Sequence, residues 1–282
     1  MNSPQAFDRI FYPSDFTPES QVAFAHGLKI AIQSKSHLQM MHVDTTDEAD
    51  WDHFPSVQDA LERWKVLPTG SSRDQVGRLG LDVSKMIASS NDPVQACLDF
   101  FEVHDVDLIV LSVHQHDGLM RWLGTMVGER ISAGSKQNTL FIPVGQKGFV
   151  SLETGEVTLR NILVPVVKKP RPESSIEFVQ RLTQSLELES GSVTLLHVGS
   201  SDTMPFVKHP LEGGWKWNVV REEGDRTETI VKVAKDLDAD LIVMTTDGQD
   251  RFLDGLRGTT SERVLRKAHC PVVVIPIESI TE

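Results

Sequence analysis

The chain has 282 residues, 28 of them basic and 40 acidic, which gives a formal net charge of −12 at pH 7. This length suits two domains of about 140 residues, each large enough to bury its own core. An acidic chain repels phosphate groups, so its charge argues against sequence-independent nucleic-acid binding and against attachment to an anionic membrane. Two cysteines, no apolar run near the roughly 18 residues of a membrane helix, and an N-terminus without a leader pattern predict a cytoplasmic protein.

Strand-like and helix-like segments alternate through the first half. An apolar run at 8–15 predicts a strand, and a helix is expected to begin at Thr17 and Pro18, a capping residue followed by a residue suited to the first helical position. A further helix, entered through Asp92 and Pro93, is predicted before the fourth strand, and another after it. The remaining strands are predicted at 37–44, 81–92, 107–113 and 138–144.

The second half follows the same order. Strands are predicted at 160–167, 192–198, 215–222, 240–246 and 271–277, and helices at about 172–188, 226–237 and 260–268. The strands are continuously apolar rather than alternating, which is typical of parallel sheets covered on both faces. The sequence therefore predicts an α/β fold with two tandem, doubly wound, parallel five-stranded sheets.

An internal duplication fixes the domain organisation. Residues 107–144 align without a gap with residues 240–277, and ten of the thirty-eight positions are identical. We place the first domain at 1–146, a linker at 147–158 and the second domain at 159–282. Because the halves are copies, a functional feature kept in one and lost in the other can be read directly.

The loop after the fourth strand of the second half is the main candidate site. Ligands of doubly wound sheets bind beyond the carboxyl ends of the strands. This loop has Gly248, nine further residues, Gly258 and then Thr259 at the start of a helix. Thr259 and Glu262 have the spacing of a capping box, and amides and hydroxyls at a helix N-terminus attract phosphate.

With these residues the chain resembles the tandem form of the universal stress proteins. The resemblance rests on IFYPSD and ILVPVV in the first strands, MMHV and LLHV in the second strands, and SERVLRKAHCPVVVIP near the end. It implies a Rossmann-like fold in which the fifth strands of the two domains pair as an internal pseudo-dimer, with half-sites too far apart to complete one another. In ATP-binding members the loop reads Gly-x-x-Gly-x9-Gly-Ser/Thr, and an Asp after the first strand lies near the base.

Neither half carries the complete pattern. The second half matches it at Gly248, Gly258, Thr259 and Ser261, but Thr245 replaces the first glycine and Val167 replaces the aspartate. The first half keeps Asp15, whereas Gln115, Thr125 and Met126 occupy the positions of Gly248, Gly258 and Thr259. The resemblance thus implies ATP or another adenine nucleotide, with Mg, in the second domain. Asp15 either contacts a base or ribose or caps the first helix.

Other chemistry-bearing residues have ordinary structural interpretations beside the functional ones. His114, His116 and Asp117 could approach a metal, but zinc requires further ligands that the sequence does not indicate, and a solvated pair of loop histidines is commoner. His42 and His197 are expected to be framework residues, Trp215 and Trp217 to pack on one face of a strand, and Cys97 to be a packed thiol. We assign no metal ligand and no catalytic residue.

The resulting hypothesis is a non-catalytic stress-response or signalling module, gated by an adenine nucleotide in the second domain. No nucleophile with an adjacent base and no Gly-x4-Gly-Lys-Ser/Thr loop is found, so an enzyme is not expected. Two alternatives stay open: a nucleotide-free scaffold that acts through protein partners, and a slow ATP-hydrolysing or phosphate-transferring enzyme. The protein partner is unknown, and the sequence does not decide whether the whole chain forms a homodimer.

Overall fold

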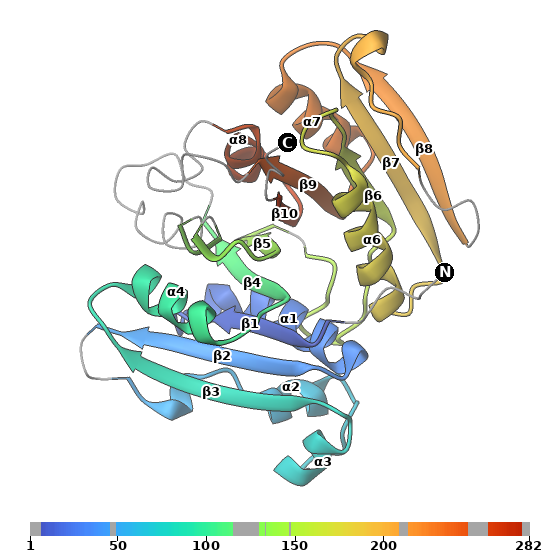
Figure 1. Ribbon diagram of the computed structural model, residues 1–282. Helices are drawn as coiled ribbons and strands as arrows, with labels where there is room; N and C mark the ends of the chain where they lie inside the picture. Colours follow the sequence, from blue (N-terminus) through green and yellow to red (C-terminus); the bar gives the residue numbers. More distant parts are fainter. Residues whose placement is uncertain are drawn as a thin grey trace.

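A single ten-stranded sheet runs through the molecule (Figure 1). The computed structural model describes residues 7–45, 49–114, 130–132, 134–146, 148–208, 214–247 and 259–277. The strand order is β3-β2-β1-β4-β5-β10-β9-β6-β7-β8, so each half contributes five adjacent strands. No helix among the described residues is long and apolar enough to cross a membrane.

The elements of the first half agree with the predicted order. The strands are β1 (Arg9–Pro13), β2 (His37–Asp44), β3 (Asp82–Ser89), β4 (Leu108–Val113) and β5 (Thr139–Pro143). The helices are the 3-10 turns η1 (Pro18–Ser20) and η2 (Trp51–His53), with α1 (Gln21–Ser34), α2 (Val57–Arg63), α3 (Arg73–Gly77) and α4 (Pro93–Val103). The segment with η2, α2 and α3 was not predicted, because helices of seven and five residues are too short for a helical period to be visible.

The second half repeats the plan with fewer additions. Its strands are β6 (Asn161–Pro165), β7 (Ser190–Val198), β8 (Gly214–Glu222), β9 (Leu241–Asp247) and β10 (Val272–Ile277). Its helices are α6 (Glu173–Ser185), η3 (Ser201–Thr203), α7 (Arg226–Asp236) and α8 (Thr260–Lys267). The predicted helix after β4 falls largely outside the described residues.

The fifth strands join the halves, as expected. β5 and β10 pair antiparallel, with Val272 opposite Phe141 and Val274 opposite Thr139, whereas every other strand pair in the sheet is parallel. The strands of the two halves therefore run in opposite directions along the sheet. The carboxyl ends of the strands in one half therefore lie on the opposite side of the sheet from those in the other half. The two half-sites are expected at these carboxyl ends.

Apolar side chains cover both faces of the sheet, as a doubly wound fold requires. On one face, β1, β4 and β6 pack with buried residues of α1, α2 and α6. On the other, buried residues of α4, α7 and α8 pack against alternate positions of the same strands. Helix starts are capped by short polar side chains. Asp92 accepts N–H bonds from Val94 and Gln95, and Asp225 accepts one from Glu228.

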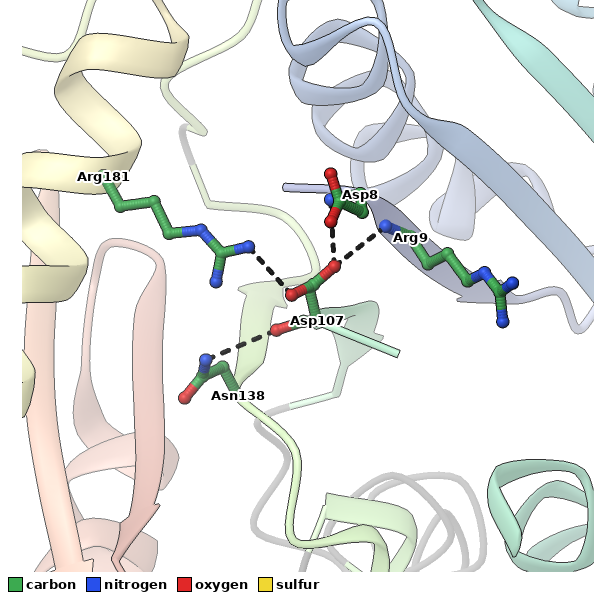
Figure 2. A network of polar contacts seen from close by, with 5 residues as sticks. All are labelled: Asp8, Arg9, Asp107, Asn138 and Arg181. Atoms are coloured by element: carbon green, nitrogen blue, oxygen red, sulfur yellow. Dashed lines mark hydrogen bonds and ion pairs between the residues drawn. The ribbon is translucent and has the colours of Figure 1, made fainter. Parts of the chain in front are cut away.

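A partly buried polar network crosses between the halves (Figure 2). Asp107 Oδ2, just before β4, accepts hydrogen bonds from the backbone N–H groups of Asp8 and Arg9, both at 2.9 Å. Its Oδ1 accepts a bond of 2.8 Å from Nη2 of Arg181, which comes from α6 in the second half. The Arg181 guanidinium also lies 4.2 Å from the ring centre of Phe7. These contacts help to fix how α6 sits against the first half.

The segment predicted to be a linker is packed onto the first half. Phe149 and Val150 are buried, and Val150 forms a β-bridge with Val157. The buried ring of His26 in α1 accepts hydrogen bonds at Nε2 from the N–H groups of Phe149 and Val150, while its Nδ1 donates to the carbonyl oxygen of Val22. The connector is thus held in place by α1. The domain boundaries at 146 and 159 stay a prediction.

Candidate functional site

A cavity of about 270 Å³ lies beyond the carboxyl ends of β6, β7 and β9 in the second half. Thr245 at the end of β9 lines it, and so do Thr259 and Ser261 at the start of α8. Three of the predicted site residues therefore meet in one place. Gly248 and Gly258, also predicted, lie outside the described residues.

The start of α8 gives this cavity a polar wall. Thr259 is the N-cap residue, and its Oγ1 accepts a hydrogen bond of 3.1 Å from the N–H of Glu262. The Glu262 carboxylate forms an ion pair of 2.7 Å with Arg266, one turn further on. The first N–H groups of any helix lack partners within it, and they carry the positive end of the helix dipole. The wall formed by 259–261 is therefore suited to an anionic group.

Two cationic side chains also line the cavity, and the sequence analysis did not identify them. Lys169 follows β6, and Arg226 is the first residue of α7. Both are exposed side chains at the rim of the cavity. Their positions could have been found from the sequence, since each comes directly after a predicted strand or at the start of a predicted helix near the carboxyl ends of the strands.

The loop after β6 is held by a histidine. The Nδ1–H of His197, at the end of β7, donates to the carbonyl oxygen of Val166 at 3.0 Å, and its Nε2 is 2.9 Å from Oγ1 of Thr203. In the first half, His42 donates in the same way to the carbonyl oxygen of Ser14 at 2.7 Å. Both histidines thus act as framework, as expected. They fix the strand-one loops that border each cavity.

The corresponding cavity of the first half has the same size but different chemistry. It measures about 270 Å³ and is lined by Asp15, His42, Cys97 and Ser112 together with apolar residues. None of its described lining residues is a lysine or arginine. Asp15 Oδ1 accepts bonds from the N–H and the hydroxyl of Thr17 at 3.0 and 2.7 Å, so its carboxylate is engaged in the turn before η1. Gln115, Thr125 and Met126 fall outside the described residues.

The remaining chemistry-bearing residues are the two cysteines and the histidines and aspartate after β4. Cys97 and Cys270 are buried free thiols, and burial raises the pKa of each to about 12. Such thiols are poor nucleophiles at neutral pH. His116 and Asp117 lie outside the described residues. Within the described ranges, no three His, Cys, Asp or Glu side chains gather as a metal site would require.

Comparisons with known proteins agree with this architecture. The model of the universal stress protein family matches residues 6–143 and 207–276. Two universal stress proteins of Methanocaldococcus jannaschii are 25% identical over 151 residues and 30% identical over 132 residues. These alignments span 44% and 46% of this chain and 86% and 82% of the relatives.

A solved structure shows the same fold over the full length. The crystal structure of a universal stress protein from Archaeoglobus fulgidus covers 98% of both chains with a TM-score of 0.62, at 16% sequence identity. The tandem arrangement, with both five-stranded halves in one chain, is therefore shared with that protein.

Proposed function

Since the chain belongs to the universal stress protein family, we propose that it is a non-catalytic stress-response or signalling module that binds an adenine nucleotide, such as ATP, in its second half. The convergence of Thr245, Thr259 and Ser261 with Lys169 and Arg226 in one cavity carries this proposal. Two solved universal stress proteins are described with cAMP and with AMP bound. Those descriptions concern those proteins, and the proposal for this chain rests on the cavity.

The chemistry of the cavity suits the phosphate end of a nucleotide. Hydroxyls and backbone N–H groups at the start of α8 can donate to phosphate oxygens, and the two cations add charge-assisted bonds. The first half offers no described cation at its cavity and places the acidic Asp15 there. A phosphate group is therefore favoured in the second half and disfavoured in the first.

The cavity offers fewer specific contacts to the base of the nucleotide than to its phosphates. Val167 lines the second-half cavity at the position where Asp15 stands in the first half. A valine gives van der Waals contact but no hydrogen bond, so we expect weak discrimination among bases. ATP, ADP and AMP should then differ in affinity according to their phosphates, and GTP should bind within about tenfold of ATP.

The experiment is a thermal-unfolding titration with Mg-ATP up to millimolar concentration. A ligand at 100 times its dissociation constant stabilises the native state by about 2.7 kcal/mol, so binding should raise the melting temperature in a saturable way. Turnover is measured in the same samples as phosphate release. A rise in melting temperature without phosphate release supports a non-catalytic module that binds the nucleotide. No rise overturns the proposal in favour of a scaffold, and release of phosphate overturns it in favour of an enzyme.

Variants locate the site. Gly258→Val should abolish the rise, because Gly258 matches the glycine that ATP-binding members of the family keep directly before the Ser/Thr of their loop. Lys169→Met should weaken binding about tenfold through loss of a charge-assisted bond. Its control is Lys168→Met, because Lys168 donates to the carbonyl oxygen of Asp202 and does not line the cavity. Unchanged affinity in both Gly258→Val and Lys169→Met would remove the proposed site.

A further inference from the structure

A larger cavity, separate from the two cavities at the carboxyl ends of the strands, lies between β3 and the segment inserted before it. It measures about 730 Å³, and its lining comes from η2, the start of α2, α3 and β3. This segment, residues 45–81, has only the shorter stretch 199–213 as its counterpart between β7 and β8. The cavity is therefore a feature of the first half alone, and none of its lining residues belongs to the two strand-end cavities.

Two cationic side chains line this cavity without a polar partner among the described residues. Arg73 comes from α3 and Lys85 from β3, and neither side chain makes a hydrogen bond or ion pair with a described residue. Nζ of Lys85 lies 5.4 Å from the ring centre of Phe54. Burial, and then repulsion by Arg73, lowers the pKa of Lys85, while the charge of Asp52 acts in the opposite direction. The two positive charges are thus close enough to disfavour one another.

Neither acidic residue of the cavity forms an ion pair with Arg73 or Lys85. Asp82 Oδ2 lies 3.6 Å from Nδ1 of His37 on the neighbouring strand β2, and its side chain is largely exposed. Asp52 is close enough to influence Lys85 but forms no ion pair with it. An anion that entered the cavity would interact with both cations and remove their mutual repulsion.

The wall of the cavity provides a flat apolar surface. Trp51 is 53% exposed although it lies beside Phe54, with ring centres 6.2 Å apart. Val57, Val76 and Leu81 line the cavity floor with apolar side chains. An exposed indole in the lining of the cavity is suited to stacking against a planar ring. A volume of this size is within the range of small-molecule sites.

We propose that this cavity binds a small organic anion with a planar ring, its anionic group held by Arg73 and Lys85 and its ring packed against Trp51. The site is independent of the nucleotide cavity in the second half. The ligand class follows from the pairing of two cationic side chains, without an ion-pair partner among the described residues, with an exposed aromatic surface. A nucleic acid would need a wider basic surface than these two side chains offer.

The test is calorimetric titration of the full-length protein with 1-naphthyl phosphate, which combines a planar ring and an anion. Saturable binding is expected, with inorganic phosphate and 1-naphthol each binding at least tenfold more weakly. Arg73→Gln and Lys85→Met should each weaken binding about tenfold, and Trp51→Ala about threefold. Arg78→Gln and Lys65→Met change the same residue types outside the cavity and should leave the affinity unchanged.

Three outcomes would overturn the proposal. The first is absence of binding to the unmodified protein. The second is unchanged affinity in both Arg73→Gln and Lys85→Met. The third is binding that survives these changes but is lost in Lys169→Met, which would place the probe in the second-half cavity instead. If inorganic phosphate binds as tightly as 1-naphthyl phosphate, the part assigned to Trp51 is wrong.

Discussion

Helices α1 and α6 occupy the same place in the two halves, and each is followed by a residue with left-handed backbone geometry, Lys35 directly after α1 and Glu187 two residues after α6. Matched from these ends, buried His26 corresponds to buried Phe178. The histidine holds the connector through two backbone bonds, whereas the phenylalanine packs against Phe7 with ring centres 5.7 Å apart. The two halves share this helix, but the equivalent residues His26 and Phe178 make different contacts.

The same division appears at the strand-end cavities. The second half gathers hydroxyls and two cations around its cavity, and the first half keeps an aspartate and a thiol around one of equal volume. The first half in turn carries the inserted segment and the packed connector. Ligand binding at a strand-end cavity is thus expected in the second half only, and the structural additions are concentrated in the first half.

The largest effect is expected at the connector, which has no counterpart among the described residues of the second half. Phe149→Ala should destabilise the protein by about 3 to 5 kcal/mol, because a fully buried aromatic ring is replaced by a cavity. Urea denaturation measures this change. Phe206→Ala, at a side chain that is 90% exposed, is the control and should stay within about 0.5 kcal/mol. A similar small effect at Phe149 would mean that the connector is only loosely attached.

A pH-dependent loss of stability is expected from His26. Burial lowers the pKa of His26 to about 4, from 6.5 in the unfolded chain. The unfolded chain therefore takes up a proton between pH 6.5 and 4 that the folded protein does not, so stability falls as the pH falls through this window. The loss amounts to about 3 kcal/mol, and it should be absent above pH 6.5.

The variant His26→Phe tests this assignment by installing the residue of the second half. It should lower stability at pH 7 by about 2 kcal/mol, because the N–H groups of Phe149 and Val150 lose their acceptor. It should also flatten the pH dependence between 6.5 and 4, as measured by urea denaturation at several pH values. An unchanged slope would assign the acid sensitivity to other groups.

A smaller effect is expected where the halves meet. Arg181→Met should cost about 1 to 3 kcal/mol, since it leaves the half-buried carboxylate of Asp107 without its charged partner. The matched change in the first half is Lys29→Met. Burial lowers the pKa of Lys29, so removal of its charge should cost less than about 1 kcal/mol. Equal effects in thermal or urea unfolding would show that the asymmetric ion pair contributes little.

The smallest effect is expected at Asp15. Asp15→Ala removes the two bonds to Thr17 and should cost about 0.5 to 1 kcal/mol, without changing the affinity for Mg-ATP. Thr259→Ala removes a helix cap of similar strength in the second half, but it should weaken nucleotide binding as well. A loss of affinity in Asp15→Ala would place the nucleotide in the first half.

Much of this architecture could be predicted from the sequence because its signals are local. Continuous apolar runs such as 240–246 and capping residues such as Asp92 mark strands and helix starts without knowledge of their neighbours. The duplication then indicated that both halves share one order of elements, and the family resemblance implied the pairing of β5 with β10. The two cations at the second-half cavity need more than a local signal. Each position follows a predicted strand or begins a predicted helix, but that Lys169 and Arg226, 57 positions apart in the sequence, line one cavity follows only from the fold.

The structure of residues 147–158 and of the inserted segment 45–81 was not predicted, for a different reason. Residues 147–158 contain glycine, threonine and glutamate, a composition typical of a flexible linker. What orders them is the acceptor nitrogen of a buried histidine more than a hundred positions earlier, and no local pattern reports such a contact. For the same reason the cavity beside β3 became visible only once the short helices α2 and α3 were in place.

The antiparallel pairing of β5 with β10 within one chain has a consequence for how this protein can vary. In a dimer of identical subunits every substitution appears on both sides of the symmetry axis, so a site cannot be lost from one subunit and kept in the other. Here the two sides are encoded separately while their association does not depend on protein concentration. A change such as valine for aspartate after β6 can therefore alter one cavity and leave its twin as it was.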